Sequence, residues 1–252
     1  MTSTYSNRDH EIIHRQMTPS HKLHENHFNA TSVLYITPHN SLHRYIRVYY
    51  IQRSTESDLR LSIDDILQDS IKISKTINKK DIPVLTILQG GVFWGNGKVY
   101  IGDFVTKEES KNEVIAEWKP CRIIHGINVF TFIPPNDNDK VKGKDTMKTD
   151  FVRQNRHPIT LKRTTIISSR SESFVKDSVT YIWRFDKKIN DFCMTLYSQR
   201  GGIEEIVAKA RRPWYFDNTG GCITLDESKI DTLTVVLTTI AMWRKLRLRT
   251  NR

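Results

Sequence analysis

The segment that most constrains the fold lies near the C-terminus, where residues 232–243 carry no charged side chain and the residues that follow are rich in Arg and Lys. The spacing of one helical face is repeated by Leu233, Val236, Leu237, Ile240 and Ala241. Apolar groups on the other faces are supplied by Val235, Met242 and Trp243. A helix that is apolar on all sides has to be enclosed by protein or by lipid.

The length of this segment distinguishes enclosure by protein from enclosure by lipid. Its 12 residues make a rod of about 18 Å, whereas a helix that spans a bilayer needs about 20 apolar residues. A barrel strand of about six to eight residues is roughly 20 to 26 Å long. We therefore expect a helix inside the protein's own barrel and no transmembrane segment. A buried strand is the alternative, because Val, Ile and Thr also favour strands.

The start of the helix is indicated by Ser228 and Asp231, whose spacing resembles a capping box. The cationic residues after Trp243 suit the negative end of the helix dipole. We expect the helix to begin at Ser228 and to end among these cations.

Short runs rich in β-branched and aromatic residues fill most of the rest of the chain. They are residues 32–37, 45–52, 71–77, 84–88, 99–104, 114–118, 122–133, 159–167, 179–185, 192–197, 205–210 and 221–225. In the run 179–185, Tyr181 and Trp183 alternate with Ile182 and Arg184, as expected of a wall with an inner and an outer face. Asn96-Gly97 predicts a tight hairpin turn, because such a turn needs positive φ. The predicted fold is mainly β, a closed antiparallel barrel of about twelve strands around a buried C-terminal helix.

The domain boundaries follow from where this pattern is lost. Residues 1–27 are polar and contain His without a completed metal site, so we expect a flexible leader. Residues 28–247 form the predicted barrel domain, with a mobile loop at 134–158 that lacks any apolar period. Residues 248–252 are expected to be a basic tail.

The cysteines and the N-terminal residues suggest the compartment. Cys121, Cys193 and Cys222 are odd in number and form no C-x-x-C pair, which fits a reducing environment. The N-terminus has no apolar segment of the kind found in secretion signals. We expect a cytoplasmic protein that is peripheral to a membrane if it binds one.

The charge distribution suggests the type of partner. The chain has 39 Lys and Arg against 28 Asp and Glu, a net charge of +11, and residues 134–252 carry 23 of the cations against 14 of the anions. Such an excess favours association with anionic membrane lipid or nucleic acid.

The feature order from Tyr181 to Trp243 has a counterpart in a known superfamily. The residues concerned are Tyr181-x-Trp183, Leu196-Tyr197 before a turn, the run from Ile206 to Arg212, Gly221-x-Ile-Thr-Leu225 and the apolar terminal helix. This order resembles the tubby-C-terminal-like superfamily of tubby domains, phospholipid scramblases and plant LURP-one-related proteins, and looks closest to its fungal branch of unknown function. The resemblance implies a twelve-stranded barrel around a central helix and an association with phosphoinositides or other membrane lipids.

The candidate binding residues are cations close to aromatic side chains. The predicted lipid-headgroup site comprises Lys209, Arg211, Arg212, Lys162, Arg163, Lys187 and Lys188, with Trp214 and Tyr215 at the membrane interface. A guanidinium can bind a phosphate through two hydrogen bonds, and Trp and Tyr rings favour the lipid–water interface. The alternative is a strand edge with solvated charges and core aromatics.

Residues typical of catalysis are not grouped into a known motif. His39, His43 and His125 occur without G-x-S-x-G, H-E-x-x-H or a glycine fingerprint, and the neighbours Glu204 and Glu205 are expected to point apart. We predict a non-enzymatic protein without a cofactor or metal that binds anionic lipids, in particular phosphoinositides. Nucleic-acid binding and a protein-interaction scaffold without a small ligand are the alternatives.

Overall fold

The computed structural model describes residues 28–37, 45–51, 82–89, 96–103, 114–120, 128–133, 157–164, 171–185, 191–213 and 220–250. The predicted leader, most of the predicted loop 134–158 and the strand expected at 71–77 lie outside these residues. The described residues form twelve strands and one helix. The strands are β1 (Ser32–Ile36), β2 (Tyr45–Tyr50), β3 (Leu85–Gln89), β4 (Gly97–Ile101), β5 (Val114–Pro120), β6 (Asn128–Phe132), β7 (Ile159–Arg163), β8 (Ser171–Lys176), β9 (Val179–Phe185), β10 (Asp191–Arg200), β11 (Ile203–Pro213) and β12 (Gly221–Leu225).

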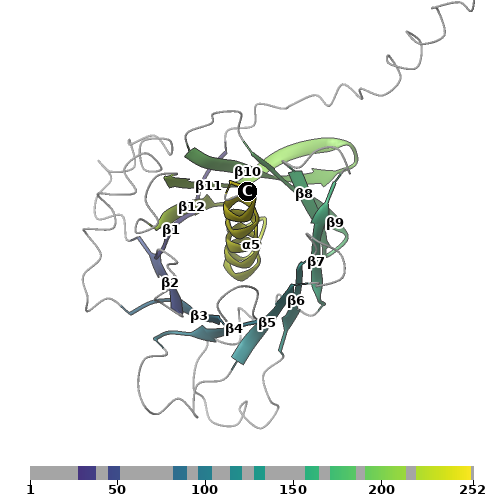
Figure 1. The fold of residues 1–252 in the computed structure, drawn as a ribbon. Helices are drawn as coiled ribbons and strands as arrows, with labels where there is room; N and C mark the ends of the chain where they lie inside the picture. The colour runs from purple at the N-terminus through teal and green to yellow at the C-terminus, as the bar shows by residue number, and fades with distance from the viewer. Residues whose placement is uncertain are drawn as a thin grey trace, which may run out of the picture.

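These strands form a closed barrel in which each strand is antiparallel to its neighbours in the chain. The ring is completed by β1 and β12, which pair from Ser32 opposite Leu225 to Ile36 opposite Gly221. The helix α5 (Thr232–Thr250) passes through the middle of the ring (Figure 1). The prediction of a mainly β, closed antiparallel barrel around a buried C-terminal helix is therefore confirmed.

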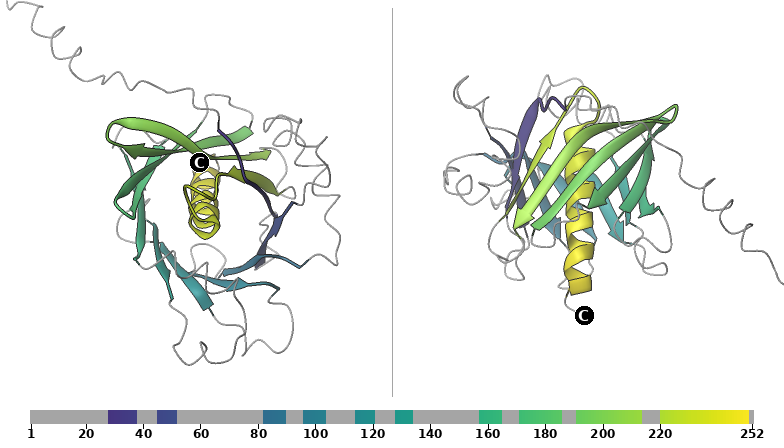
Figure 2. Two further views of the ribbon diagram at one scale, coloured as in Figure 1. Left: turned by 180° about the vertical axis from the view of Figure 1, so that it is seen from behind. Right: turned by 90° about the horizontal axis from the view of Figure 1, so that it is seen from above.

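Helix α5 is enclosed by the barrel wall over the whole uncharged segment. Every residue from Ile230 to Trp243 is buried, including the predicted core residues Leu233, Val236, Leu237, Ile240 and Ala241. The helix has 19 residues, about 28 Å at 1.5 Å per residue, and its C-terminal turns project beyond the strands (Figure 2). Among the described residues, no helix has the length and hydropathy required to span a bilayer.

Thr238 of α5 satisfies its buried hydroxyl group with partners from the protein. The Thr238 hydroxyl donates to the Thr234 carbonyl oxygen at 2.8 Å and accepts the indole N–H of Trp183 at 3.0 Å. Trp183 lies on the inner side of β9 and is fully buried. The Thr238 hydroxyl therefore binds a carbonyl of its own helix and a core indole at the same time, which makes it compatible with an apolar interior.

The start of α5 differs from the prediction. The helix begins at Thr232, and the Asp231 carboxylate accepts the backbone N–H of Thr234 at 2.9 Å, which makes Asp231 the N-cap residue. Ser228 lies in the preceding turn, where its hydroxyl donates to the Asp226 carboxylate at 2.6 Å. The prediction that Ser228 begins the helix is wrong, because the Ser228 hydroxyl is bound to Asp226. Asp231 instead accepts a hydrogen bond from one of the first backbone N–H groups of the helix.

Two further strand predictions are corrected. Gly97 is the first residue of β4 and pairs with Gln89, so Asn96-Gly97 is not the centre of a two-residue hairpin turn. Strand β8 was not predicted, because its sequence Ser-Glu-Ser-Phe-Val-Lys has no apolar run. Its inner face nevertheless contains Phe174, which stacks on Tyr181 with 5.1 Å between the ring centroids.

The barrel has two chemically different ends. Because neighbouring strands are antiparallel, β12 runs from one end to the other and α5 returns through the centre. We call the end at which α5 starts the Asp231 end. The opposite end, at which α5 leaves the barrel, is the Arg244 end. It contains the ends of β1, β3, β5, β7, β9 and β11 and the starts of β2, β4, β6, β8, β10 and β12.

Candidate anion-binding site at the Arg244 end

The predicted basic residues of β7 and β11 lie at the same end of the barrel but on separate parts of its wall. Three strands, β8, β9 and β10, separate β7 from β11. Both β7 and β11 run toward the Arg244 end, however, and they terminate there with Lys162-Arg163 and with Arg211-Arg212-Pro213. Lys162 and Arg163 are exposed, and Arg211 and Arg212 are half-buried.

Lys209 belongs to the wall and is separate from this group. It lies within β11 opposite Thr195 of β10 and Thr224 of β12. Its ammonium nitrogen is 5.8 Å from the centroid of the Phe28 ring, a cation–π contact on the outer surface. The other predicted site residues, Lys187, Lys188, Trp214 and Tyr215, lie outside the described part of the chain, as do His39, His43 and His125.

Alternation along β11 explains why its cations face different surroundings. Ala208 and Ala210 are buried on the inner side, so Lys209 and Arg211 project outward. Arg212 is two residues after Ala210 and therefore lies on the inner side as well. It lines a cavity between the wall and α5.

This cavity has a volume of about 30 Å³ and lies at the Arg244 end. It is lined by Ile36, Thr37, Ile46, Arg212, Gly220, Gly221, Ile240, Trp243 and Arg244. Three isoleucines supply apolar walls, and two arginines and one tryptophan supply the N–H groups. No carboxylate is among these lining residues.

Arg244 is held over an aromatic ring inside the barrel mouth. Its guanidinium carbon is 4.5 Å from the centroid of the Trp118 ring, and the Trp118 indole N–H donates to the Asn128 side-chain oxygen at 3.0 Å. Burial lowers the pKa of Arg244 to about 10, since loss of water disfavours the charged form. The side chain therefore remains cationic at neutral pH.

Trp243 is placed beside Arg244 by two glycines at the start of β12. A Cβ atom at Gly221 would lie 2.3 Å from the Trp243 ring, and one at Gly220 would lie 2.0 Å from the Ile36 carbonyl oxygen. Only glycine allows this close approach of strand and indole. Trp243 is 4% exposed, and its indole N–H has no hydrogen-bond partner among the described residues.

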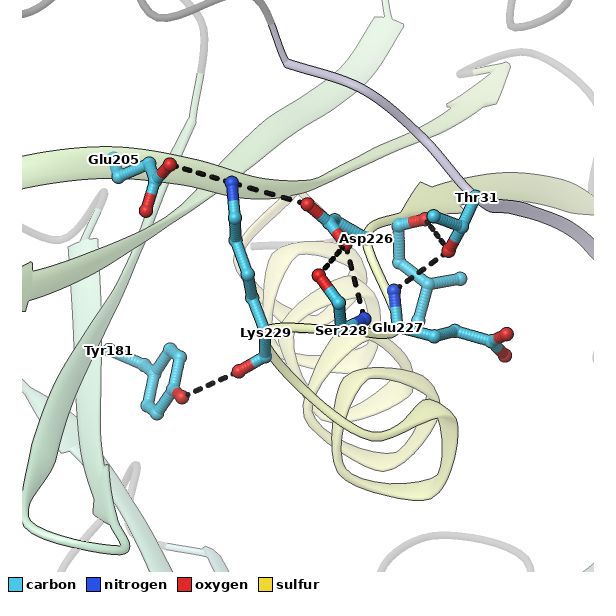
Figure 3. A network of polar contacts seen from close by, with 8 residues as sticks. Thr31, Tyr181, Glu205, Asp226, Glu227, Ser228 and Lys229 are labelled. Atoms are coloured by element: carbon cyan, nitrogen blue, oxygen red, sulfur yellow. Dashed lines mark hydrogen bonds and ion pairs between the residues drawn. The ribbon is translucent and has the colours of Figure 1, made fainter.

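The charged residues of the Asp231 end form a network of hydrogen bonds and ion pairs (Figure 3). Lys229 binds Glu205 at 2.6 Å and Asp226 at 3.2 Å, and its carbonyl oxygen accepts the Tyr181 hydroxyl at 3.1 Å. Lys176 forms an ion pair with the N-cap carboxylate of Asp231. These contacts join β8, β9, β11 and the β12–α5 connection, so the network holds the start of α5 in place.

The remaining members of that network attach α5 to the first two strands. The Glu227 carboxylate accepts the hydroxyls of Tyr50 at 2.8 Å and Thr232 at 2.5 Å, and its backbone N–H donates to the Thr31 hydroxyl at 2.9 Å. Burial raises the pKa of Tyr50 to about 12. Each of these polar groups has a protein partner, which is typical of a structural network.

Glu204 and Glu205 point apart, as predicted from their adjacent positions. The Glu204 carboxylate accepts one hydrogen bond from each terminal nitrogen of Arg184, at 2.6 and 2.5 Å. The Glu205 carboxylate binds Lys229 instead. The Arg184 guanidinium also lies 4.8 Å from the Tyr197 ring centroid. The two carboxylates therefore stabilise different parts of the barrel and share no site.

The comparisons with known proteins leave the chain without an assigned relative. No model of a known protein family matches it, and neither a curated protein nor a solved structure is significantly similar to it.

The sequence did not predict the cavity at the Arg244 end. Trp243 and Arg244 are expected from the sequence as core residue and dipole partner, and the pair Gly220-Gly221 as part of a turn. Trp243, Arg244 and the two glycines line one cavity with Arg212 because of the register between β11 and β12, which places Arg211 opposite Cys222. The one feature of the sequence that could have indicated the cavity is that Arg244 directly follows Trp243 at the end of the uncharged segment.

Proposed function

We propose that the protein is a non-enzymatic binding protein for anionic membrane lipids, which it contacts with the Arg244 end of the barrel. The observation that carries this proposal is the gathering of cations from distant parts of the chain at that end. The described cations there are Lys98, Lys119, Lys162, Arg163, Arg211, Arg212 and Arg244. The carboxylates at the same end whose side chains the structure describes are Glu117 and Glu172.

The position of α5 supports the same orientation. The helix projects beyond the strands at the Arg244 end, and its final turns include the positions of Lys245, Arg247 and Arg249. Cationic residues near an anionic membrane contribute about 1 kcal/mol each. Several at one end are therefore sufficient for reversible peripheral binding, which salt weakens by screening.

Phosphoinositides are the lipids that we expect to bind best, because several phosphates on one head group engage several cations at once. The same ligand class is implied by the resemblance to the tubby-C-terminal-like superfamily. We propose membership of that superfamily on the order of strands and the central C-terminal helix, in addition to the sequence features between Tyr181 and Trp243.

Flotation with lipid vesicles tests the proposed function. Phosphatidylcholine vesicles that contain a phosphoinositide are expected to carry the protein, and pure phosphatidylcholine vesicles are not. Lys162→Glu reverses one exposed charge at the Arg244 end and is expected to weaken binding by about 2 kcal/mol, or more than tenfold.

The matched control is Arg200→Glu, because Arg200 is exposed and lies at the Asp231 end. Both substitutions change the net charge equally, so only the location of the charge differs. Equal effects of the two variants would contradict binding through the Arg244 end. Binding of DNA or RNA in preference to every vesicle would favour nucleic acid as the ligand.

A further inference from the structure

The cavity beside Trp243 offers hydrogen-bond donors and very few acceptors. Its polar side chains are those of Arg212, Arg244, Trp243 and Thr37, and the Thr37 hydroxyl already accepts the backbone N–H of Arg47 at 2.8 Å. Arginine and the tryptophan indole can only donate. A ligand that fits this lining has to accept hydrogen bonds and carry negative charge.

Two properties of the lining favour an anion energetically. The Trp243 N–H is buried without a partner among the described residues, and a buried donor without an acceptor is costly. Arg244 is cationic in surroundings that lower its pKa to about 10 through burial. An oxyanion in the cavity would accept the Trp243 N–H and add a favourable charge interaction with the nearby Arg244 guanidinium.

The volume limits how much of a ligand can enter. A site needs about 10 to 15 Å³ for one water-sized group, so a cavity of about 30 Å³ accommodates two oxygen atoms. A sugar or inositol ring is too large, whereas the end of a phosphate group fits. A phosphate monoester matches two guanidinium groups better than a diester, because its terminal oxygens carry close to two negative charges.

We propose that this cavity binds the terminal oxygens of a phosphate monoester, with Arg212 and Arg244 as charged donors and the Trp243 indole as the third donor. If the phosphate belongs to a lipid, this site rests on the proposed function, because the lipid head group would then bring the phosphate to the Arg244 end. A soluble phosphate has the same chemistry, and the experiment separates the two sources.

The first measurement uses the full chain with uniform ¹⁵N labelling of its tryptophans and inorganic phosphate as the probe. The chain has five tryptophans, and Trp243→Phe identifies the indole N–H signal of Trp243. Phosphate is expected to shift this signal saturably, whereas chloride at equal ionic strength is not. Arg212→Gln is expected to weaken phosphate binding at least about fivefold. Arg200→Gln is the control that leaves it unchanged, because Arg200 is exposed at the opposite end of the barrel.

The second measurement compares vesicles that contain phosphatidic acid, a phosphate monoester, with vesicles that contain phosphatidylglycerol, a diester, at equal surface potential. The wild type is expected to prefer phosphatidic acid by about fivefold. Trp243→Phe and Arg212→Gln are expected to lose this preference and keep binding to both vesicles. Lys162→Gln is expected to weaken both and keep the preference. Circular dichroism of each variant establishes that it is folded.

The outcomes distinguish the cavity from the proposed function. A Trp243 signal that phosphate does not shift, together with equal binding of the two vesicles, overturns the cavity and leaves lipid binding intact. A saturable shift without binding to any vesicle supports the cavity as a site for a soluble phosphate and overturns the lipid proposal. A preference that persists in both Trp243→Phe and Arg212→Gln also overturns the cavity.

Discussion

Gly221 determines where the largest side chain of α5 can lie. The Trp243 ring packs against the backbone of β12 at a distance that no Cβ atom permits. The neighbouring Gly220 is restricted in the same way by the Ile36 carbonyl oxygen. The position of the indole, and with it one wall of the cavity, therefore depends on two residues that have no side chain.

Gly221→Ala is expected to destabilise the protein by about 2 kcal/mol or to displace Trp243, because overpacking of this kind typically costs about 1 to 3 kcal/mol. Urea unfolding followed by circular dichroism measures the change. Gly97→Ala is the matched control, since a Cβ atom there comes no closer than 3.4 Å to Trp118. A Gly221→Ala variant as stable as Gly97→Ala would contradict the close packing.

At the residue scale the sequence predicted burial better than it predicted contacts. Leu233, Val236 and Ile240 are buried as their spacing indicates. The sequence could not show that Arg212 and Arg244 approach one cavity, because residues 32 positions apart in the chain are brought together only by strand register. Alternation along β11 does explain the separation of Lys209 from Arg212.

The connection between β12 and α5 takes part in three ion pairs among the described residues, those of Lys229 with Glu205 and Asp226 and that of Asp231 with Lys176. Burial by itself raises the pKa of Asp226, but hydrogen bonds from Ser228 and Lys229 outweigh it and the pKa is lowered. Glu227 behaves in the same way through Thr232, Ser32 and Tyr50. Because both pKa values fall on folding, both carboxylates stabilise the folded state above their ordinary pKa values.

This stabilisation is expected to be lost as the pH falls below about 4 and through the lowered pKa values of the folded state. The melting temperature should therefore drop in acid more steeply than it does between pH 5 and 7. Asp226→Asn is expected to lower the melting temperature at pH 7 and to flatten the acid dependence. Thermal unfolding at a series of pH values measures both effects. An acid dependence equal to that of the wild type would contradict the role of Asp226.

Element types were more predictable than element boundaries. The segments at β1, β2 and β12 are rich in β-branched and aromatic residues, and they were predicted as strands from that composition. Strand β8 was missed because Glu172 is buried on its inner face together with Phe174, which removes the apolar–polar alternation. The N-cap at Asp231 was assigned to Ser228 because a serine hydroxyl can cap a helix or a turn, and only tertiary packing selects between them.

The barrel and α5 share one hydrophobic core. The cluster of buried residues includes side chains from both ends of the wall and from α5, among them Leu34, Phe130, Trp183 and Leu237. Neither part could keep its apolar surface out of water without the other. The two parts are therefore expected to unfold together.

Coincident transitions measure this cooperativity. Urea unfolding followed by far-ultraviolet circular dichroism and by tryptophan fluorescence is expected to give one midpoint. Thr238→Val removes the hydroxyl that binds the Trp183 indole, and should lower both midpoints equally. A fluorescence transition that precedes loss of secondary structure would indicate that α5 leaves an intact barrel.

The closure of the ring by β1 and β12 also has a consequence for biosynthesis. Strands β1 to β11 emerge from the ribosome before β12, which joins them into a ring, and α5, which fills the lumen, emerges after all twelve strands. Until residues 221–250 have been made, the inward-facing apolar side chains have nothing to pack against. Closure of the barrel therefore has to follow the synthesis of β12 and α5, and the apolar inner face of the earlier strands is open to aggregation until then.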